Sequence, residues 1–407
     1  MSDWPSAPFG TLYDVPSKNG LMAPSAVRGT GARLVNMREI FAYDCISNQP
    51  MELAPIPSKT PDVWMLRPGD LLFARQSLTL AGAGKVVLVG DLPEPTMFES
   101  HIIRVRLDQA RADSGFYYYL FRSQPGRRLI ESIVEQVAAA GIRSSDLAAL
   151  EVPVPPLSEQ RRIAAVLGSL DDLIETDIVL ARTLAEMTTA AAEKSIAAMA
   201  NRTMKPLTDY ATVTKGFSYK SAELVPSTDV LVGLKNIQRG GVFQVAGLKP
   251  IRSERIKSDQ IIQAGELVVS MTDLTQGREV VGRPIRIPDC GGAGRMVASL
   301  DLSILRPTVG YTSAFLSVAL SGGSFHSFAM GYCNGTTVVH LSPTVFQNYL
   351  VPDVHPDEAL AIGELIAELN RTEDACRAEV ADLTRTRDEL LPLLMSGRVR
   401  VSESMSL

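Results

Sequence analysis

The sequence VPVPPLSEQRRIAAVLGSLDDLIETDIVLARTLAEMTTAAAEKSIAAMAN, residues 152–201, decides the fold. Its prolines Pro153, Pro155 and Pro156 favour an extended lead-in, because proline fixes φ and lacks an N–H. Ser158 can accept hydrogen bonds from the first free amides of a helix, so we expect a long helix to begin there. The apolar residues that follow alternate three- and four-residue spacing, which predicts a coiled-coil seam. This seam comprises Ile163, Val166, Leu170, Leu173, Leu180, Leu184 and Met187, with Asp177 in a core position.

A second stretch of the same kind closes the chain. It follows Pro352, with Asp357 as the expected N-cap, and keeps heptad spacing. Its seam comprises Ile362, Ile366, Leu369, Glu373, Cys376, Val380, Leu383, Arg387, Leu390 and Leu394. A helix of about 40 residues spans roughly 60 Å and cannot bury such a stripe alone, so we expect the two helices to pair. The alternative is two unrelated amphipathic helices on separate cores.

Length and composition narrow the class of protein. A chain of 407 residues suggests two to three domains. It has no run of about 18 apolar residues and no basic N-terminal region followed by an apolar one, which predicts a cytoplasmic protein. Its cysteines, Cys45, Cys290, Cys333 and Cys376, stand far apart and are expected to be buried thiols. The four histidines are equally scattered, so no metal site is expected.

The net charge of −5 is unevenly distributed. Residues 203–352 carry 14 basic and 10 acidic side chains, whereas residues 353–407 carry 6 and 12. The acidity therefore lies mainly on the predicted helices. A basic globular part can face phosphates, and acidic helices suit protein partners better than DNA.

The chain contains an internal repeat. LVNMREI (34–40) aligns with LVGLKNI (231–237), LRPGDLL (66–72) aligns with IQAGELV (262–268), and the Val-Pro pair at 152–153 aligns with that at 351–352. Together with the heptad helix, four features recur in the same order at a separation of nearly 200 residues. The pattern predicts a tandem duplication of a globular domain followed by a long helix.

Each globular unit is expected to be mixed α/β (α+β), with a curved, antiparallel-rich sheet. Strands are predicted at residues 71–74, 85–89, 266–270 and 285–287, helices at 114–130 and 312–328, and polar loops at 139–145 and 334–342.

Motifs of catalysis are weak. Residues 82–85 (GAGK) lack the first glycine and the hydroxyl residue of a phosphate-binding loop. Asp171 and Asp172 are expected to form a solvated helix face. There is no Gly-x-Ser-x-Gly nucleophile elbow. Nothing in these patterns argues for an enzyme.

Two polar loops, both directly after a predicted strand, are more informative. Arg, Gln, Thr and Asp are side chains that can read base edges, which makes these loops candidate DNA-binding segments. The first set comprises Arg75 and Gln76, with Lys85 beyond, and the second comprises Thr272, Asp273, Gln276 and Arg278. The alternative is that both are plain surface turns, with Asp273 closing its own turn.

A further set of candidates lies elsewhere in the two repeats. Arg143 and Ser144 in the first unit, and Thr336, Thr337 and His340 in the second, stand on the polar loop before the proline lead-in, where they could meet phosphate or a base edge. Equally, the hydroxyls and His340 could only cap that loop. Lys235 and Asn236 complete the candidate DNA-binding set.

These motifs together resemble the specificity subunit of type I restriction-modification systems. The resemblance rests on VPVPPLSEQRRI (152–163), GDLLFAR (69–75), GELVVSMTDLT (265–275), GTTVVHLS (335–342) and ELLPLLMSGRVRV (389–401). It implies two target-recognition domains, residues 1–151 and 203–352, each binding one half of a split DNA sequence. Residues 152–202 and 353–407 would form the antiparallel spacer helices and a C-terminal tail.

The resemblance also implies partners. The chain would be a non-catalytic scaffold on double-stranded DNA that carries methyltransferase subunits, two being expected, and a restriction or translocase subunit in some assemblies. S-adenosylmethionine would belong to the methyltransferase and no cofactor to this chain. The overall negative charge favours the alternative of a two-domain protein-interaction scaffold with no DNA role.

Overall fold

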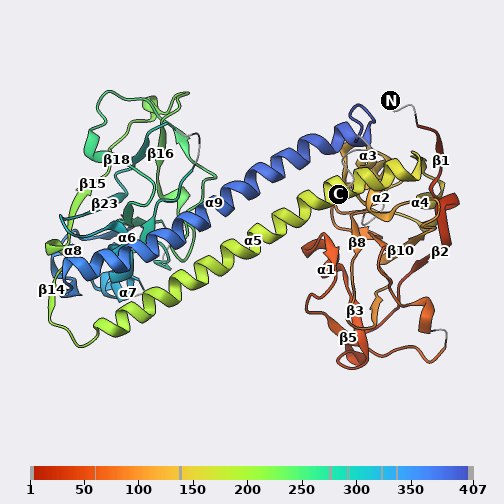
Figure 1. Cartoon of the computed structure of the whole chain (residues 1–407), viewed down its shortest axis with the longest axis horizontal. Helices are drawn as coiled ribbons and strands as arrows, with labels where there is room; N and C mark the ends of the chain where they lie inside the picture. Colours follow the sequence, from red (N-terminus) through yellow and green to blue (C-terminus); the bar gives the residue numbers. More distant parts are fainter. Residues whose placement is uncertain are drawn as a thin grey trace. The chain divides into compact units, whose positions relative to one another are not determined.

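The computed structural model (Figure 1) describes residues 4–59, 61–136, 140–274, 277–290, 292, 294–321, 324–335 and 338–401. It divides into two compact units. Unit 1 comprises Met1–Ile174 and Asp382–Leu407, and unit 2 comprises Glu175–Ala381. Each unit therefore contains a globular domain and parts of two long helices, α5 (Leu157–Met199) and α9 (Pro356–Met395).

Unit 1 is built from short strands and helices. In chain order these are β1 (Ser6–Pro8), β2 (Tyr13–Asn19), β3 (Ala32–Val35), α1 (Met37–Ala42), β4 (Cys45–Ile46), β5 (Glu52–Ala54), β6 (Leu71–Ala74), β7 (Gln76–Ser77), β8 (Val86–Val89), β9 (Thr96–Phe98), β10 (Ile102–Leu107), α2 (Ser114–Arg122), α3 (Gln124–Ser132), β11 (Glu135–Gln136), β12 (Ala140–Gly141), α4 (Ser144–Ala149) and β13 (Glu151–Pro153). The sheets have the orders β2-β10-β6-β8-β4, β5-β3-β9, β11-β12-β7 and β1-β13. The β4/β8 and β3/β9 pairs are parallel, and the other pairs are antiparallel.

Unit 2 repeats this plan. Its elements are β14 (Met204–Pro206), β15 (Ala211–Lys215), β16 (Val230–Val232), β17 (Lys249–Pro250), β18 (Ile261–Ile262), β19 (Leu267–Ser270), β20 (Thr272–Asp273), β21 (Pro284–Arg286), β22 (Met296–Ala298), β23 (Leu302–Pro307), α6 (Ser313–Ala319), α7 (Ser324–Ala329), β24 (Cys333–Asn334), β25 (Val339–Leu341), α8 (Val345–Asn348) and β26 (Leu350–Pro352). The sheets have the orders β15-β23-β19-β21, β17-β16-β22-β18, β20-β25-β24 and β14-β26. The mixed α/β class with two long helices is therefore confirmed, although each unit has several small sheets in place of one curved sheet.

The internal repeat is also visible in matching polar contacts. The Asp70 carboxylate accepts hydrogen bonds from Arg106 at 2.7 Å, and Glu266 accepts from Arg306 at 2.8 Å. Each carboxylate also accepts from a backbone amide three residues before it, at 2.8 and 2.9 Å. The glycine before each carboxylate has a positive φ, 87° and 84°, which suits glycine because it has no Cβ. The two turns thus have one backbone design.

The predicted helix 114–130 is two helices. Asp113 caps α2 by accepting from the Phe116 amide at 2.9 Å. At Ser123 the backbone turns extended, and the Ser123 hydroxyl caps α3 while Pro125 lies in its first turn. In unit 2 the predicted helix 312–328 is likewise divided into α6 and α7. These helices cover the principal sheet of their unit, and the largest apolar cores lie between them.

The two long helices begin earlier than expected, α5 by one residue and α9 by two. Helix α5 starts at Leu157, so Ser158 lies in its first turn. Helix α9 starts at Pro356, so Asp357 is inside the first turn rather than at the N-cap. Proline is well suited to the first helical position because the amide it lacks has no partner there.

The predicted seam of α5 is partly wrong. Leu173, Leu180 and Met187 are 42–51% exposed. The buried apolar residues are Ile163, Leu167, Ile174, Ala181, Leu184, Ala192 and Met199. The buried stripe thus runs through the residues directly after Leu173 and Leu180, about 100° further round the helix.

The α9 seam is confirmed, because every residue in it is buried or half-buried. In unit 1, Leu394 and Met395 of α9 share a core with Ile163 and Leu167 of α5. In unit 2, the later part of α5 and the earlier part of α9 pack together through Ala181, Leu184, Cys376 and Leu369. The helices therefore pair antiparallel in each unit and do not lie on separate cores.

Asp171 is not part of a solvated face. Its carboxylate accepts a hydrogen bond from the Tyr119 hydroxyl of α2 at 2.7 Å and pairs with Arg387 of α9 at 2.8 Å. Burial and this carboxylate raise the pKa of Tyr119, which stays a hydrogen-bond donor. One carboxylate therefore joins the globular domain of unit 1 to both helices.

The thiols are less buried than expected. Cys376 is buried, Cys290 and Cys333 are half-buried, and Cys45 is exposed. Among the described residues, no helix is long and apolar enough to cross a membrane, and no cluster of three His, Cys, Asp or Glu side chains could hold a metal ion.

Candidate nucleic-acid interface

A small three-stranded sheet in each unit brings together segments that are far apart in the sequence. In unit 1 it is β11-β12-β7, and in unit 2 it is β24-β25-β20. The residues 139–145 and 334–342, predicted as loops, supply the central strands β12 and β25. The two polar loops that were predicted after a strand, with Gln76 in unit 1 and Thr272 and Asp273 in unit 2, supply the edge strands β7 and β20. The strands that carry the described candidates Gln76, Thr272, Asp273 and His340 are therefore paired with the other candidate segment of their unit.

The same hydrogen bonds fix this sheet in both units. The Ile142 amide donates to the Arg75 carbonyl at 2.9 Å, and the Leu341 amide donates to the Met271 carbonyl at 2.8 Å. Gln76 pairs with Gly141, and Thr272 pairs with His340. One backbone frame is thus built twice with different side chains.

In unit 1 this frame presents polar side chains to solvent. Gln76 is exposed, and the half-buried Arg75 side chain has no hydrogen bond or ion pair within the described ranges. Arg143 is exposed and pairs with Glu135 at 2.6 Å. The Ser144 hydroxyl donates to the Asn19 side chain at 3.0 Å. Arg75, Gln76 and Arg143 thus contribute to a polar surface. Within the described ranges, the Arg75 guanidinium has no carboxylate partner.

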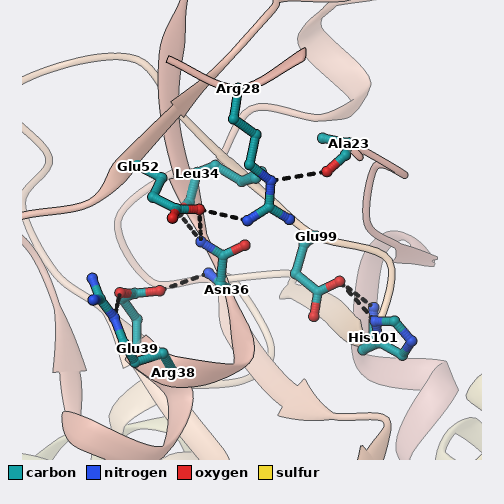
Figure 2. A network of polar contacts seen from close by, with 9 residues as sticks. All are labelled: Ala23, Arg28, Leu34, Asn36, Arg38, Glu39, Glu52, Glu99 and His101. Carbon is teal, nitrogen blue, oxygen red and sulfur yellow. Dashed lines mark hydrogen bonds and ion pairs between the residues drawn. The ribbon is translucent and has the colours of Figure 1, made fainter. Parts of the chain in front are cut away.

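His101 and Glu99 position Arg75. The Glu99 carboxylate accepts from the His101 amide at 3.1 Å and from its Nδ1 at 2.8 Å, as Figure 2 shows. The His101 carbonyl in turn accepts from the Arg75 amide at 2.7 Å. Sequence reasoning missed this pair, which lies directly before β10, a strand that was not predicted either.

Lys85 is turned toward the protein. Its ammonium donates to the Phe41 carbonyl at 3.1 Å and lies 5.8 Å from the centre of the Phe41 ring. Burial lowers the pKa of Lys85, partly offset by Asp44. Lys85 therefore contributes less to an exposed cationic surface than Arg143 does.

In unit 2, two candidate residues prove to be structural. The buried Asp273 carboxylate accepts from the Val280 and Val281 amides at 2.8 and 3.2 Å. The buried Thr272 hydroxyl bonds to Asp301 at 2.9 Å. Their polar atoms hold the backbone and are not open to a base edge. Asp273 therefore has a structural role, as its alternative assumed, but it closes the segment up to Val281 and not a tight turn of its own.

Arg278 and His340 are described candidates at the small sheet of unit 2 that stay accessible. His340 lies exposed on the central strand β25. Arg278 is half-buried and has a φ of 51°, the one positive φ at a non-glycine residue in the described part of the chain. Such a conformation costs energy for a side-chain-bearing residue and recurs at functional sites. Gln276, Thr336 and Thr337 lie outside the described residues.

Asn236 is also structural. It is 1% exposed, accepts from the Gly233 amide at 3.0 Å and donates to the Gln244 carbonyl at 3.1 Å. Lys235 beside it is exposed. Asn236 is therefore a turn-closing residue, and the cation of this turn is Lys235.

The equivalent turn in unit 1 repeats this design with other residues. Glu39 takes the place of Asn236, and its carboxylate accepts from the Asn36 amide at 2.9 Å and from Arg38 at 2.9 Å (Figure 2). Arg38 is largely exposed and aligns with Lys235. Sequence reasoning missed Arg38, although the aligned heptapeptides could have identified it. Close by, Arg28 pairs with Glu52 (Figure 2).

Comparison with known proteins agrees with this architecture. A family model described as the type I restriction modification DNA specificity domain matches residues 65–179. The type I restriction enzyme MjaVIII specificity subunit of Methanocaldococcus jannaschii is 27% identical over 111 residues, 27% of this chain and 26% of that protein. The putative MjaX specificity subunit of the same organism is 28% identical over 109 residues, 26% and 25% of the two chains. The chain thus spans about a quarter of the length of the curated relatives it matches.

A solved structure matches over nearly the whole chain. The type I restriction-modification system S subunit from M. genitalium has a TM-score of 0.67 and 17% identity, with 97% of this chain and 96% of that chain covered. At this identity the likeness shows the fold. The resemblance expected from the sequence is thereby confirmed: residues 65–179 match the type I restriction-modification DNA specificity domain, and the chain has, over nearly its whole length, the fold of a type I specificity subunit.

Proposed function

We propose that this chain recognises a bipartite DNA sequence, one half-site with each unit, and catalyses no reaction itself. The observation that carries the proposal is the small sheet built twice on one hydrogen-bonded frame with different exposed side chains. Unit 1 offers Arg75, Gln76 and Arg143, and unit 2 offers Arg278 and His340. Arginine can bind guanine and glutamine can bind adenine through paired hydrogen bonds in the major groove.

The proposed domains follow the sequence boundaries. Residues 1–151 and 203–352 would be the target-recognition domains, and residues 152–202 and 353–407 would hold the spacer helices and the C-terminal tail. The proposal is supported by helices α5 and α9, which lie inside the two spacer segments. Paired helices of this length are stiff enough to hold two reading surfaces at a set interval.

The partners proposed are two methyltransferase subunits and, in some assemblies, a restriction or translocase subunit. Leu180 and Met187, which lie seven residues apart on one exposed side of α5 in unit 2, support a protein partner, because large apolar side chains along one face of a helix are a common docking surface. S-adenosylmethionine would bind to the methyltransferase. The assembly would act on host and incoming DNA in the cytoplasm.

Two measurements test the proposal. Methylome sequencing of the host with and without this gene should reveal one split motif that depends on the gene. The purified complex should shift duplex DNA, and the shift should weaken with salt because phosphate contacts release counterions. A methylome unchanged by deletion, together with no DNA shift, would favour the protein-interaction scaffold.

A further inference from the structure

Leu78 and Leu274 occupy equivalent places in the two units. Each follows the edge strand of the small sheet, β7 in unit 1 and β20 in unit 2, and the two are 196 residues apart, as the surrounding repeat requires. Leu78 is 98% exposed and Leu274 is 70% exposed. A large apolar side chain thus stands in solvent at the same point of both candidate surfaces.

In unit 1, hydrogen bonds hold the segment that presents Leu78. The Thr79 amide donates to the Ser77 hydroxyl at 3.1 Å, and the Gly82 amide donates to the Thr79 hydroxyl at 3.2 Å. Arg127 donates to the Leu80 carbonyl at 2.7 Å. The backbone on both sides of Leu78 is therefore anchored, and its exposure does not come from a segment without contacts.

In unit 2, different bonds achieve the same presentation. Leu274 directly follows Asp273, whose buried carboxylate accepts the Val280 and Val281 amides. The Ser270 hydroxyl donates to the Thr272 carbonyl at 2.9 Å. The strand leading to Leu274 is thus fixed by its own buried polar groups.

A single exposed leucine is ordinary and needs no explanation. Recurrence directly after the edge strand of the same small sheet is the distinguishing feature here. Leu300, by contrast, is 52% exposed but aligns with Ser100. The side chains next to the two leucines also differ, Arg75 and Gln76 in one unit and Arg278 in the other. A leucine retained on two otherwise different surfaces points to a contact that both surfaces make.

We propose that Leu78 and Leu274 make apolar contacts with a base of their half-sites. This inference rests on the proposed function and deepens it, because it names a contact that is neither a hydrogen bond nor an ion pair. The DNA backbone offers charged phosphates and polar sugars, so an apolar tip gains most at a base. It can touch a thymine methyl group in the groove or enter between adjacent stacked bases. Cations on the same units, such as Arg143 and Arg278, can bind the phosphates and leave the leucine to face the base pairs.

The test uses the full chain with its methyltransferase partner and the duplex found by methylome sequencing. Leu78→Ala and Leu274→Ala are compared with the control Leu80→Ala, whose carbonyl contact is retained, by fluorescence anisotropy at several salt concentrations. Each of the two variants should bind about ten-fold more weakly, and Leu80→Ala should bind as the wild type does. The slope of log K against log salt should stay unchanged, because no phosphate contact is lost.

Two further measurements distinguish a contact with a thymine methyl group from insertion between stacked bases. If the contact is to a thymine methyl, deoxyuridine in the half-site should weaken the wild type and leave Leu78→Ala unaffected. If the leucine enters the base stack, a 2-aminopurine in the half-site should brighten with the wild type and not with Leu78→Ala. Wild-type affinity in both leucine variants would overturn the inference. So would a weaker affinity of the variants if the wild type responds to neither deoxyuridine nor 2-aminopurine. A wild-type complex that fails to bind the duplex at all would instead overturn the proposed function.

Discussion

Arg286 of β21 and Asp374 of α9 form a two-point ion pair, with 2.6 and 2.7 Å between guanidinium nitrogens and carboxylate oxygens. Both side chains are largely shielded from solvent, and the Asp374 carboxylate also accepts the Asp289 amide at 3.2 Å. In unit 2 this pair joins the globular domain to the long helix. Tyr119 and Asp171 make the corresponding connection in unit 1 through a different pair of elements.

Asp374→Asn should lower the free energy of unfolding by about 2–3 kcal/mol, because it leaves a shielded arginine without its counter-charge. Urea unfolding followed by circular dichroism measures the change. The control is Glu368→Gln, which breaks an exposed pair with Arg371 on the same helix and should cost less than about 0.5 kcal/mol. Equal losses in both variants would contradict a structural role for the Arg286 pair.

Asp273→Ala and Arg75→Ala should behave differently although both residues come from equivalent segments. Asp273→Ala should destabilise the protein by about 1–3 kcal/mol, because the Val280 and Val281 amides lose their acceptor. Thermal melting measures this. Arg75→Ala should leave the melting temperature unchanged. At one base position of the first half-site, the preference for the correct base should fall by about 1–3 kcal/mol. A methylation assay on randomised targets checks it, with the second half-site as internal control.

Arg143→Ala should weaken DNA binding about equally for all sequences. Arg143 is exposed and paired only at the surface with Glu135, so its loss should change stability by less than about 0.5 kcal/mol. If Arg143 contacts a phosphate, the slope of log K against log salt should become smaller in magnitude by roughly one. Loss of one base preference would mean that Arg143 reads a base, and a lowered melting temperature would mean that it only caps its loop.

Much of the fold could be predicted because its signals are local or repeated. Strand β6 and the seam of α9 follow from short-range patterns, and the duplication follows from aligned motifs such as those around Gly69 and Gly265. The buried stripe of α5 could not be predicted in the same way, because leucines occupy the positions directly before the buried ones in the sequence. The structure buries Ala181 and leaves Leu180 exposed, and a small residue lets the facing helix approach closely. Helix periodicity alone does not distinguish the two stripes.

The candidate site was harder to predict than the fold. The strand pairing of β7 with β12 joins residues about 65 apart, so the sequence could name the two segments but not unite them. Asp273 and Asn236 have the chemistry of base-reading residues, yet their oxygens accept from backbone amides of their own loop or turn, seven and eight residues from Asp273 and three residues from Asn236. Residue type alone does not show which polar side chains hydrogen-bond within the protein and which stay open to DNA. That distinction depends on the folded structure.

The stability of unit 2 should depend on acid pH through Glu223. Hydrogen bonds from Arg255 and Ser253, and from the Lys220 amide, lower the pKa of Glu223 from 4.5 to about 2. A carboxyl with a depressed pKa in the folded state stabilises the fold above its unfolded pKa, and this contribution is lost as the pH falls from about 4.5 toward 2. Glu223→Gln should therefore reduce the decline of the melting temperature over that range. The neighbouring exposed carboxylate Glu254, changed to Gln, is the control, and identical profiles for the two variants would refute the assignment.

The gap between the proposed half-sites should depend on helix length. Removing one heptad from α5 and the facing heptad from α9 keeps the buried stripes in register, because seven residues are nearly two helical turns. It shortens the pair by about 10 Å, or roughly three base pairs of DNA. Methylome sequencing should then show the same two half-sites with a shorter gap, or no modification if the partner cannot follow. Removing the heptad from α5 alone breaks the contacts of Ala181 and Leu184 with Cys376, so it should destabilise the protein instead of changing the gap. An unchanged gap after the paired deletion would show that the helices do not set the spacing.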